Sequence, residues 1–82
     1  MDIKKTINEI ILEVLGKQIS TKDLTLDKEL VADFGANSMQ LLEIALTVSA
    51  EFDINVPKEE VLNLQSVQDI YKFVADKKGL AI

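Results

Sequence analysis

The chain has 82 residues, of which 48% are hydrophobic, and its 9 basic and 14 acidic side chains give a net charge of −5. It contains neither cysteine nor histidine, which excludes a disulfide framework, a thiolate metal site and a Ser-His-Asp triad. We therefore expect one small domain over residues 1–82 that is not an enzyme and holds no metal. A reactive serine in this chain would need another protein to activate it.

The negative charge is concentrated in the middle of the chain. Residues 18–56 contain seven acidic side chains and two lysines, which account for the whole net charge. An acidic surface repels phosphate backbones and anionic membranes, and it favours basic protein partners. We expect no nucleic-acid partner. The sequence has neither a signal peptide nor a stretch long enough to span a bilayer, so we expect a cytoplasmic protein, and a monomer.

The first predicted helix runs from about Asp2 to Leu15. Its apolar residues recur at steps of three and four, which is typical of a helix with one buried face; they are Ile3, Ile7, Ile10, Ile11, Val14 and Leu15. Asp2 can cap the start of this helix, and Gly16 can end it by adopting a left-handed conformation.

Residues 17–36 show no helical period, and we expect a long loop that single apolar side chains anchor to the core. These anchors are Ile19, Leu24, Leu26, Leu30, Val31 and Phe34. Loops of this length are uncommon and are often functional. A second helix should begin near Asn37 or Ser38 and end near Phe52.

Two further helices complete the pattern. A short one is expected from Pro57 to Leu62, with Pro57 at the first helical position, where its missing N–H costs nothing. The last should begin at Ser66, with Asp69 three residues on as a capping box, and end near Gly79. No segment alternates with period two. The sequence therefore predicts an all-α fold, a small four-helix bundle of three main helices and one short one.

The segment from Asp33 to Met39 is a turn that leads into the second helix. Gly35 permits tight geometry there, and either Asn37 or Ser38 can cap the helix. A serine at a helix start is most often only a cap. The same place also favours a phosphate-bearing group, because free N–H groups and the positive end of the helix dipole meet there.

At this point the chain resembles the acyl carrier protein family, in which a Gly-x-Asp-Ser-Leu motif opens the second helix. Here the motif reads Gly35-Ala36-Asn37-Ser38-Met39, and the similarity spans essentially the whole chain. It continues through Leu42-Glu43-Ile44, Glu51-Phe52-Asp53, Val56-Pro57 and Ser66-Val67. The resemblance implies that a phosphopantetheinyl transferase attaches 4′-phosphopantetheine from coenzyme A to Ser38.

The resemblance also implies a function and partners. The arm would hold acyl groups as thioesters and present them to acyl-loading and acyl-processing enzymes, in fatty-acid, lipid or polyketide-type biosynthesis. Two alternatives remain open in the sequence. One is an aminoacyl or peptidyl carrier of a nonribosomal or hybrid pathway, and the other is a helical interaction module whose Ser38 is never modified.

The chain departs from the family's pattern around the motif. Asn37 replaces the usual aspartate and Met39 the usual leucine, and the second helix keeps Glu43 and Glu51 as its only acids. Typical fatty-acid carriers are strongly acidic here, so we expect a specialised stand-alone carrier with its own small set of enzymes. Asn37 also leaves open which transferase recognises the chain.

A helical projection at 100° per residue divides the second helix into faces. The expected core arc is Leu41, Ala45, Val48 and Phe52, and the expected polar arc is Gln40, Glu43, Thr47 and Glu51. Met39, Leu46 and Ala50 fall on a flank between them. We expect the partner surface to include Asn37, Met39, Gln40, Glu43 and Leu46 and to rely on apolar contact. Packing of Leu46 against the third helix is the competing interpretation.

Inside the bundle, four apolar side chains are candidates to line an acyl-chain cavity, although ordinary core packing explains each of them equally well. They are Val48, Val56, Val61 and Leu64.

Overall fold

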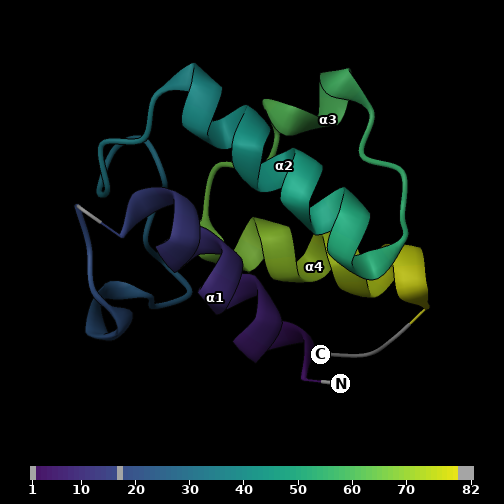
Figure 1. Cartoon of the computed structure of the whole chain (residues 1–82), viewed down its shortest axis with the longest axis horizontal. Coiled ribbons are helices and arrows are strands. Elements are labelled where there is room, and N and C mark those ends of the chain that lie inside the picture. The colour runs from purple at the N-terminus through teal and green to yellow at the C-terminus, as the bar shows by residue number, and fades with distance from the viewer. Residues whose placement is uncertain (1, 17, 80–82) are drawn as a thin grey trace.

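The computed structural model describes residues 2–16 and 18–79, and this part of the chain folds into four α-helices (Figure 1). They are α1 (Ile3–Leu15), α2 (Ser38–Phe52), α3 (Lys58–Val61) and α4 (Val67–Lys78). A single 3₁₀ turn, Thr21–Asp23, lies between α1 and α2. The only β pairing in the described residues is an isolated bridge between Glu29 and Ser66. The all-α prediction is confirmed.

Helix α1 forms because its apolar residues line one face and its first turn is capped. Asp2 Oδ1 accepts a hydrogen bond from the Lys5 N–H at 3.2 Å, as predicted. The expectation of a left-handed Gly16 is wrong, because this residue keeps right-handed angles (φ −60°, ψ −17°). A Cβ at Gly16 would collide with the Leu12 carbonyl oxygen. Lack of room for a side chain therefore explains why a glycine stands here.

The core lies where α1 packs against α2 and α4, while the main contact of α3 is with α2 (Figure 1). Its buried side chains are Ile7, Ile10, Ile11, Leu15, Leu30, Phe34, Ala36, Ile44, Val48, Phe52, Leu64, Val67, Ile70, Tyr71 and Val74. Aliphatic side chains dominate this cluster, and burying each contributes about 1.5–3 kcal/mol. The Tyr71 hydroxyl donates to Asn8 Oδ1 across the α1–α4 contact.

The starts of α3 and α4 differ in how they are fixed. Pro57 stands just before α3 in an extended conformation (φ −60°, ψ 148°), so it is the N-cap and not the first helical residue as predicted. At α4 the predicted capping box is present: Ser66 accepts from the Asp69 N–H, and Asp69 accepts from the Ser66 N–H. Gly79 ends α4 in the left-handed region (φ 70°).

The connection between α1 and α2 is held by side chains at some of the predicted anchors only. Leu30 and Phe34 are buried, and Ile19 and Leu24 are half-buried. Leu26 and Val31 are 47% and 52% exposed, so as anchors they were wrongly predicted.

Backbone hydrogen bonds fasten the same loop to the start of α4. The Leu30 N–H donates to the Gln65 carbonyl at 2.7 Å, and the Val67 N–H donates to the Lys28 carbonyl at 3.1 Å. These bonds pair backbone N–H and carbonyl groups that form no hydrogen bond within a helix. The loop is thus held by backbone pairing as well as by its two buried side chains.

Among residues 2–16 and 18–79, no helix combines the length and the apolar character that crossing a bilayer requires.

Candidate functional site

Asn37 caps α2 through a reciprocal pair of hydrogen bonds. Its Oδ1 accepts from the Gln40 N–H at 2.8 Å, and its own N–H donates to Gln40 Oε1 at 3.0 Å. The sequence left open whether Asn37 or Ser38 caps this helix. The structure assigns the cap to Asn37, in an extended conformation (φ −97°, ψ 175°).

Ser38 is the first residue of α2, and its side chain is exposed. Within the described residues its hydroxyl has no hydrogen-bond partner, and the N–H groups of Ser38 and Met39 have none either. Free N–H groups at a helix start, together with the helix dipole, stabilise a phosphate group there. Ser38 therefore offers a free hydroxyl beside two donors that suit a phosphate.

The turn before Ser38 is anchored on both sides of Gly35. Phe34 and Ala36 are buried, while Gly35 is exposed and lies in the left-handed region (φ 73°). The Gly35 N–H donates to the Val31 carbonyl at 3.0 Å, and the Ala36 N–H donates to the Leu30 carbonyl at 2.9 Å. A side chain at position 35 would be strained. This geometry explains why a glycine stands three residues before Ser38.

Gln18 reaches this turn from the other end of the loop, a contact that the sequence analysis did not predict. Its Nε2 lies 3.0 Å from the Phe34 carbonyl oxygen and 3.3 Å from that of Gly35. Its Oε1 accepts from Gln40 Nε2 at 2.8 Å. Gln40 thus bonds both to Gln18 and to Asn37. We expected Gln40 on the partner surface, and its half-buried side chain instead forms hydrogen bonds to Gln18 and Asn37.

Two loop carboxylates are held in their charged form by local hydrogen bonds. The Ser20 N–H, 2.8 Å from Asp23 Oδ2, lowers the pKa of Asp23 below the ordinary aspartate value. The Thr25 hydroxyl, 2.8 Å from Asp27 Oδ1, lowers the pKa of Asp27 likewise. These two carboxylates therefore keep their negative charge to a lower pH than an ordinary aspartate does.

The outward face of α2 is more apolar than the projection indicated. Met39 is 66% exposed and Leu46 is 61% exposed, with Leu42 at 36% between them. Packing of Leu46 against α3 was a wrong interpretation. The buried residues of α2 are Ile44, Ala45, Val48 and Phe52, with Leu41 half-buried.

Because Ile44 is part of the core, the face opposite the core is centred on Met39 and Leu46. What we assigned as a flank is this opposite face. Glu43 is exposed beside it, while Gln40 and Thr47 are only partly exposed at its edge. Leu42 was missed, although its spacing of three residues from Met39 and four from Leu46 could have indicated it. Of the residues expected on the partner surface, Met39, Glu43 and Leu46 are therefore exposed together on the outward face of α2, whereas Gln40 lies at its edge.

A pocket of about 410 Å³ opens beside Ser38, between the loop, α2 and the end of α3. Its walls are formed by Glu29, Val31, Ala32, Ser38, Leu41, Leu62 and Gln65. Leu62 and Val31, which both line it, are 70% and 52% exposed. Most of the lining is apolar, with a carboxylate and an amide at its edge.

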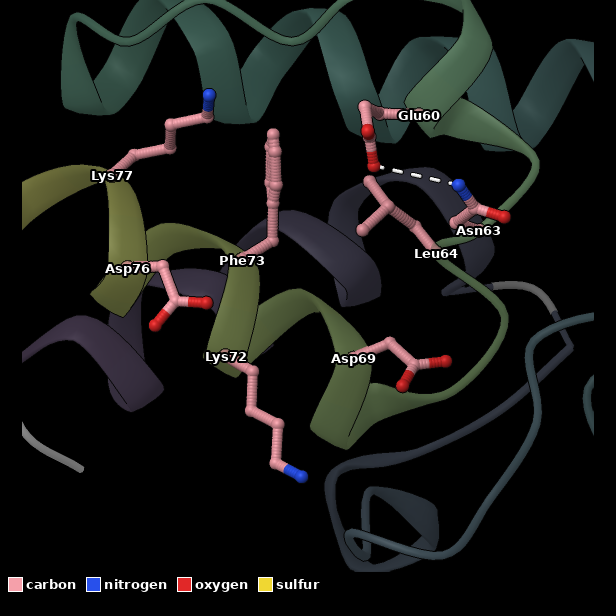
Figure 2. Close-up of a pocket in the computed structure, with 8 residues that line it drawn as sticks. All are labelled: Glu60, Asn63, Leu64, Asp69, Lys72, Phe73, Asp76 and Lys77. Atoms are coloured by element: carbon pink, nitrogen blue, oxygen red, sulfur yellow. Dashed lines mark hydrogen bonds between the residues drawn. The ribbon is translucent and has the colours of Figure 1, made fainter.

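A second pocket, of about 450 Å³, lies between α3 and α4 (Figure 2). Phe73 and Leu64 form its apolar part, and charged side chains of both signs surround them. The Lys77 Nζ lies 5.4 Å from the centre of the Phe73 ring. Of the four cavity candidates, Leu64 lines this pocket, Val48 and Val61 are buried, and Val56 is half-buried. This pocket does not include Ser38.

Comparisons with known proteins identify the family. The profile of the family described as "Phosphopantetheine attachment site" matches residues 5–74. An acyl carrier protein of Solidesulfovibrio magneticus is 32% identical over 79 residues, which cover 96% of this chain and 99% of that protein. The chain belongs to the acyl carrier protein family.

Further relatives agree with this assignment. An acyl carrier protein of Bdellovibrio bacteriovorus is 31% identical over 81 residues, covering 99% of this chain and all of the relative. A solved structure described as an acyl carrier protein of Mycobacterium tuberculosis superposes with a TM-score of 0.79 at 28% identity, over 90% of this chain and 96% of that one. These similarities confirm the four-helix acyl carrier protein fold and favour an acyl cargo over an aminoacyl or peptidyl one.

Members of the acyl carrier protein family carry 4′-phosphopantetheine and act as carriers of acyl groups, not as catalysts. The residues around Ser38 fit this group. The free hydroxyl and the two free N–H groups suit its phosphate, and the adjoining pocket matches the rest of the arm in chemistry, because both combine apolar and amide groups. The partners that the family implies are enzymes that handle acyl groups.

Proposed function

We propose that Ser38 carries 4′-phosphopantetheine and that the chain uses this arm to present acyl groups to separate enzymes. The observation that carries the proposal is the division of roles at the start of α2. Asn37 makes the capping bonds, so the Ser38 hydroxyl is exposed and free to react. A serine that capped the helix would have to give up that bond before it could be modified.

Attachment requires a second protein. The Ser38 Oγ–H bond breaks, and Oγ forms a bond to the phosphorus that bears the pantetheine. The P–O bond between the two linked phosphates of coenzyme A breaks, and the other phosphate leaves with the nucleotide. The proton needs a base, and a chain without histidine has no ordinary one at neutral pH. A phosphopantetheinyl transferase supplies it. The protein itself contributes the exposed hydroxyl and the free N–H groups of Ser38 and Met39, which stabilise the phosphate.

The pocket beside Ser38 holds the arm against the protein. Val31, Leu41 and Leu62 would contact its apolar groups, and Gln65 and Glu29 lie where its amides can find hydrogen-bond partners. Once attached, the group supplies the thiol that the sequence lacks, which holds acyl groups as thioesters.

Partner enzymes dock on the apolar face of α2, which we define as Met39, Leu42 and Leu46. These three side chains are exposed on the helix that begins with Ser38, so an enzyme that binds them also reaches the arm. Asn37 and Glu43 lie at the edge of this face. With only Glu43 and Glu51 as acids on α2, apolar contact contributes more than charge. This supports a specialised carrier with its own partners.

Intact-mass analysis tests the attachment site. The purified chain is incubated with coenzyme A and a transferase of broad specificity, and the wild type should gain the mass of one phosphopantetheine. Ser38→Ala should gain nothing. Ser66→Ala is the matched control, because Ser66 is the serine that caps α4, and this variant should be modified as fully as the wild type.

Two results would contradict the proposal. A wild type that gains no mass would favour a helical module that is never modified. A gain of mass that survives Ser38→Ala would place the arm at another residue.

A further inference from the structure

Gln18 connects three parts of the chain that meet around Ser38. Its amide nitrogen lies within hydrogen-bond distance of the Phe34 and Gly35 carbonyl oxygens, and its amide oxygen accepts from Gln40. These partners are 16, 17 and 22 residues away in the sequence. One side chain from the beginning of the loop therefore holds both the turn before Ser38 and the first turn of α2.

The connection continues through Gln40 to the residue next to Ser38. Gln40 Nε2 donates to Gln18, while Gln40 Oε1 accepts from the Asn37 N–H at 3.0 Å. The chain of contacts runs from the Phe34 and Gly35 carbonyls through Gln18 and Gln40 to Asn37. Ser38 lies within the loop that these contacts close, so its backbone is held from both sides.

Gln18 is not part of the hydrophobic core, so core packing does not explain its contacts. Gln18 is exposed, so its hydrogen bonds add to the anchoring of the turn that the buried Phe34 and Ala36 provide. The ideal Cβ of a side chain at position 35 would lie 3.7 Å from Gln18 Nε2, so the amide closely approaches the left-handed Gly35. The contact is made at the residue of this turn that has a positive φ.

We propose that Gln18 is a positioning residue for Ser38: acting with Gln40, it holds the Gly35–Ser38 turn in the form that the transferase binds. The inference rests on the proposed attachment at Ser38. Without Gln18 the turn samples other conformations, and the transferase must order it on binding, which weakens binding. The chemistry at the hydroxyl is unchanged, so the loss falls on KM and not on kcat. The network carries no charge, so its effect does not depend on salt.

Kinetics of arm attachment test this inference. Gln18→Ala should lower kcat/KM roughly 3- to 10-fold, the range expected for one or two lost hydrogen bonds. The loss should come from a higher KM, with kcat unchanged. Gln40→Glu should behave in the same way, because its carboxylate still accepts from Asn37 but cannot donate to Gln18. Gln68→Ala is the matched control: Gln68 is also exposed, and its side chain forms no hydrogen bond within the described residues, so its kinetics should match the wild type.

Hydrogen exchange of the apo protein gives a readout that is independent of the transferase. In Gln18→Ala the Asn37 amide should exchange several-fold faster, while the amides of α1 exchange at the wild-type rate. Equal kinetics and exchange in Gln18→Ala and Gln68→Ala would overturn the inference. Faster exchange throughout α1 and α4 would also overturn it, since Gln18 would then support the whole fold. If the wild type itself gains no arm, the proposed function fails, and the exchange data still decide whether Gln18 orders the turn.

Discussion

Helices α2 and α4 begin with the same device and then serve opposite purposes. Both start with a capping box, formed by Asn37 and Gln40 in α2 and by Ser66 and Asp69 in α4. In α4 the serine is the cap and its hydroxyl is occupied. In α2 the serine comes one residue later and its hydroxyl is free. The chemistry of a serine at a helix start is therefore decided by whether it stands at the cap or just after it.

The two helices also differ in what they do with their apolar residues. The large apolar residues of α4 are buried, apart from the half-buried Phe73. Helix α2 buries one side and leaves Met39, Leu42 and Leu46 exposed on the other. Both helices therefore contribute to the core, and only α2 also leaves a row of large apolar side chains exposed, which is the face that we propose for docking.

The largest expected effect separates these two roles. Ile70→Ala should lower the free energy of unfolding by about 2–5 kcal/mol, because Ile70 is completely buried. Leu46→Ala should change it by less than about 0.5 kcal/mol, because Leu46 is exposed. Urea unfolding measures both, and Ile70→Val, with an expected loss of about 0.5–1.5 kcal/mol, covers the case in which Ile70→Ala does not fold.

Leu46→Ala should instead weaken the binding of the arm-bearing protein to an acyl-loading enzyme. Glu43→Gln is the control, and it should weaken binding less, in a way that high salt removes. A larger loss from Glu43→Gln than from Leu46→Ala would contradict the apolar docking face.

The two caps should have similar effects on stability and different effects on function. Asn37→Ala and Ser66→Ala should each lower the free energy of unfolding by about 1 kcal/mol, because each leaves a helix N–H without its partner. Only Asn37→Ala should also slow arm attachment, because the cap of α2 adjoins Ser38. Asn37→Asp keeps an acceptor in place, so this variant should have the stability and the attachment rate of the wild type. Comparable slowing in Ser66→Ala would mean that general stability limits attachment.

The smallest expected effect concerns the contact between α4 and α1 at high pH. Burial raises the pKa of Tyr71 above its ordinary value near 10. Above pH 10 the unfolded chain therefore releases this proton before the folded chain does, and stability falls as the pH rises. Urea unfolding at pH 8 and pH 11 should show a smaller loss in Tyr71→Phe than in the wild type. An equal loss would mean that Tyr71 does not contribute.

Local signals in the sequence were sufficient for the helices. The bounds of α1, α2 and α4 follow from apolar spacing and from caps at Asp2, at Asn37 or Ser38, and at Ser66. The structure places each bound within about one residue of its prediction. Pro57 was placed one position too far inside α3, since proline is acceptable at both places and the sequence does not distinguish them.

Contacts between distant residues could not be predicted in the same way. The apolar pattern of α2 fits several rotations, so the burial of Ile44 and the exposure of Leu46 depend on where α1 and α3 pack. Val31 was expected to anchor the loop, but it lines the pocket beside Ser38. The bond from Gln40 to Gln18 joins residues 22 positions apart, and neither belongs to a recognisable motif with the other.

The backbone hydrogen bonds between the loop and the start of α4 affect the order in which the protein folds during its synthesis. The segment before Ser38 is tied to residues 65–68, through Leu30 with Gln65, Lys28 with Val67, and Leu26 with Gln68. A ribosome releases the loop and α2 well before it releases these partners. We therefore expect Ser38 to reach its final setting only when residues 65–68 have folded, so that the proposed attachment of the arm follows folding.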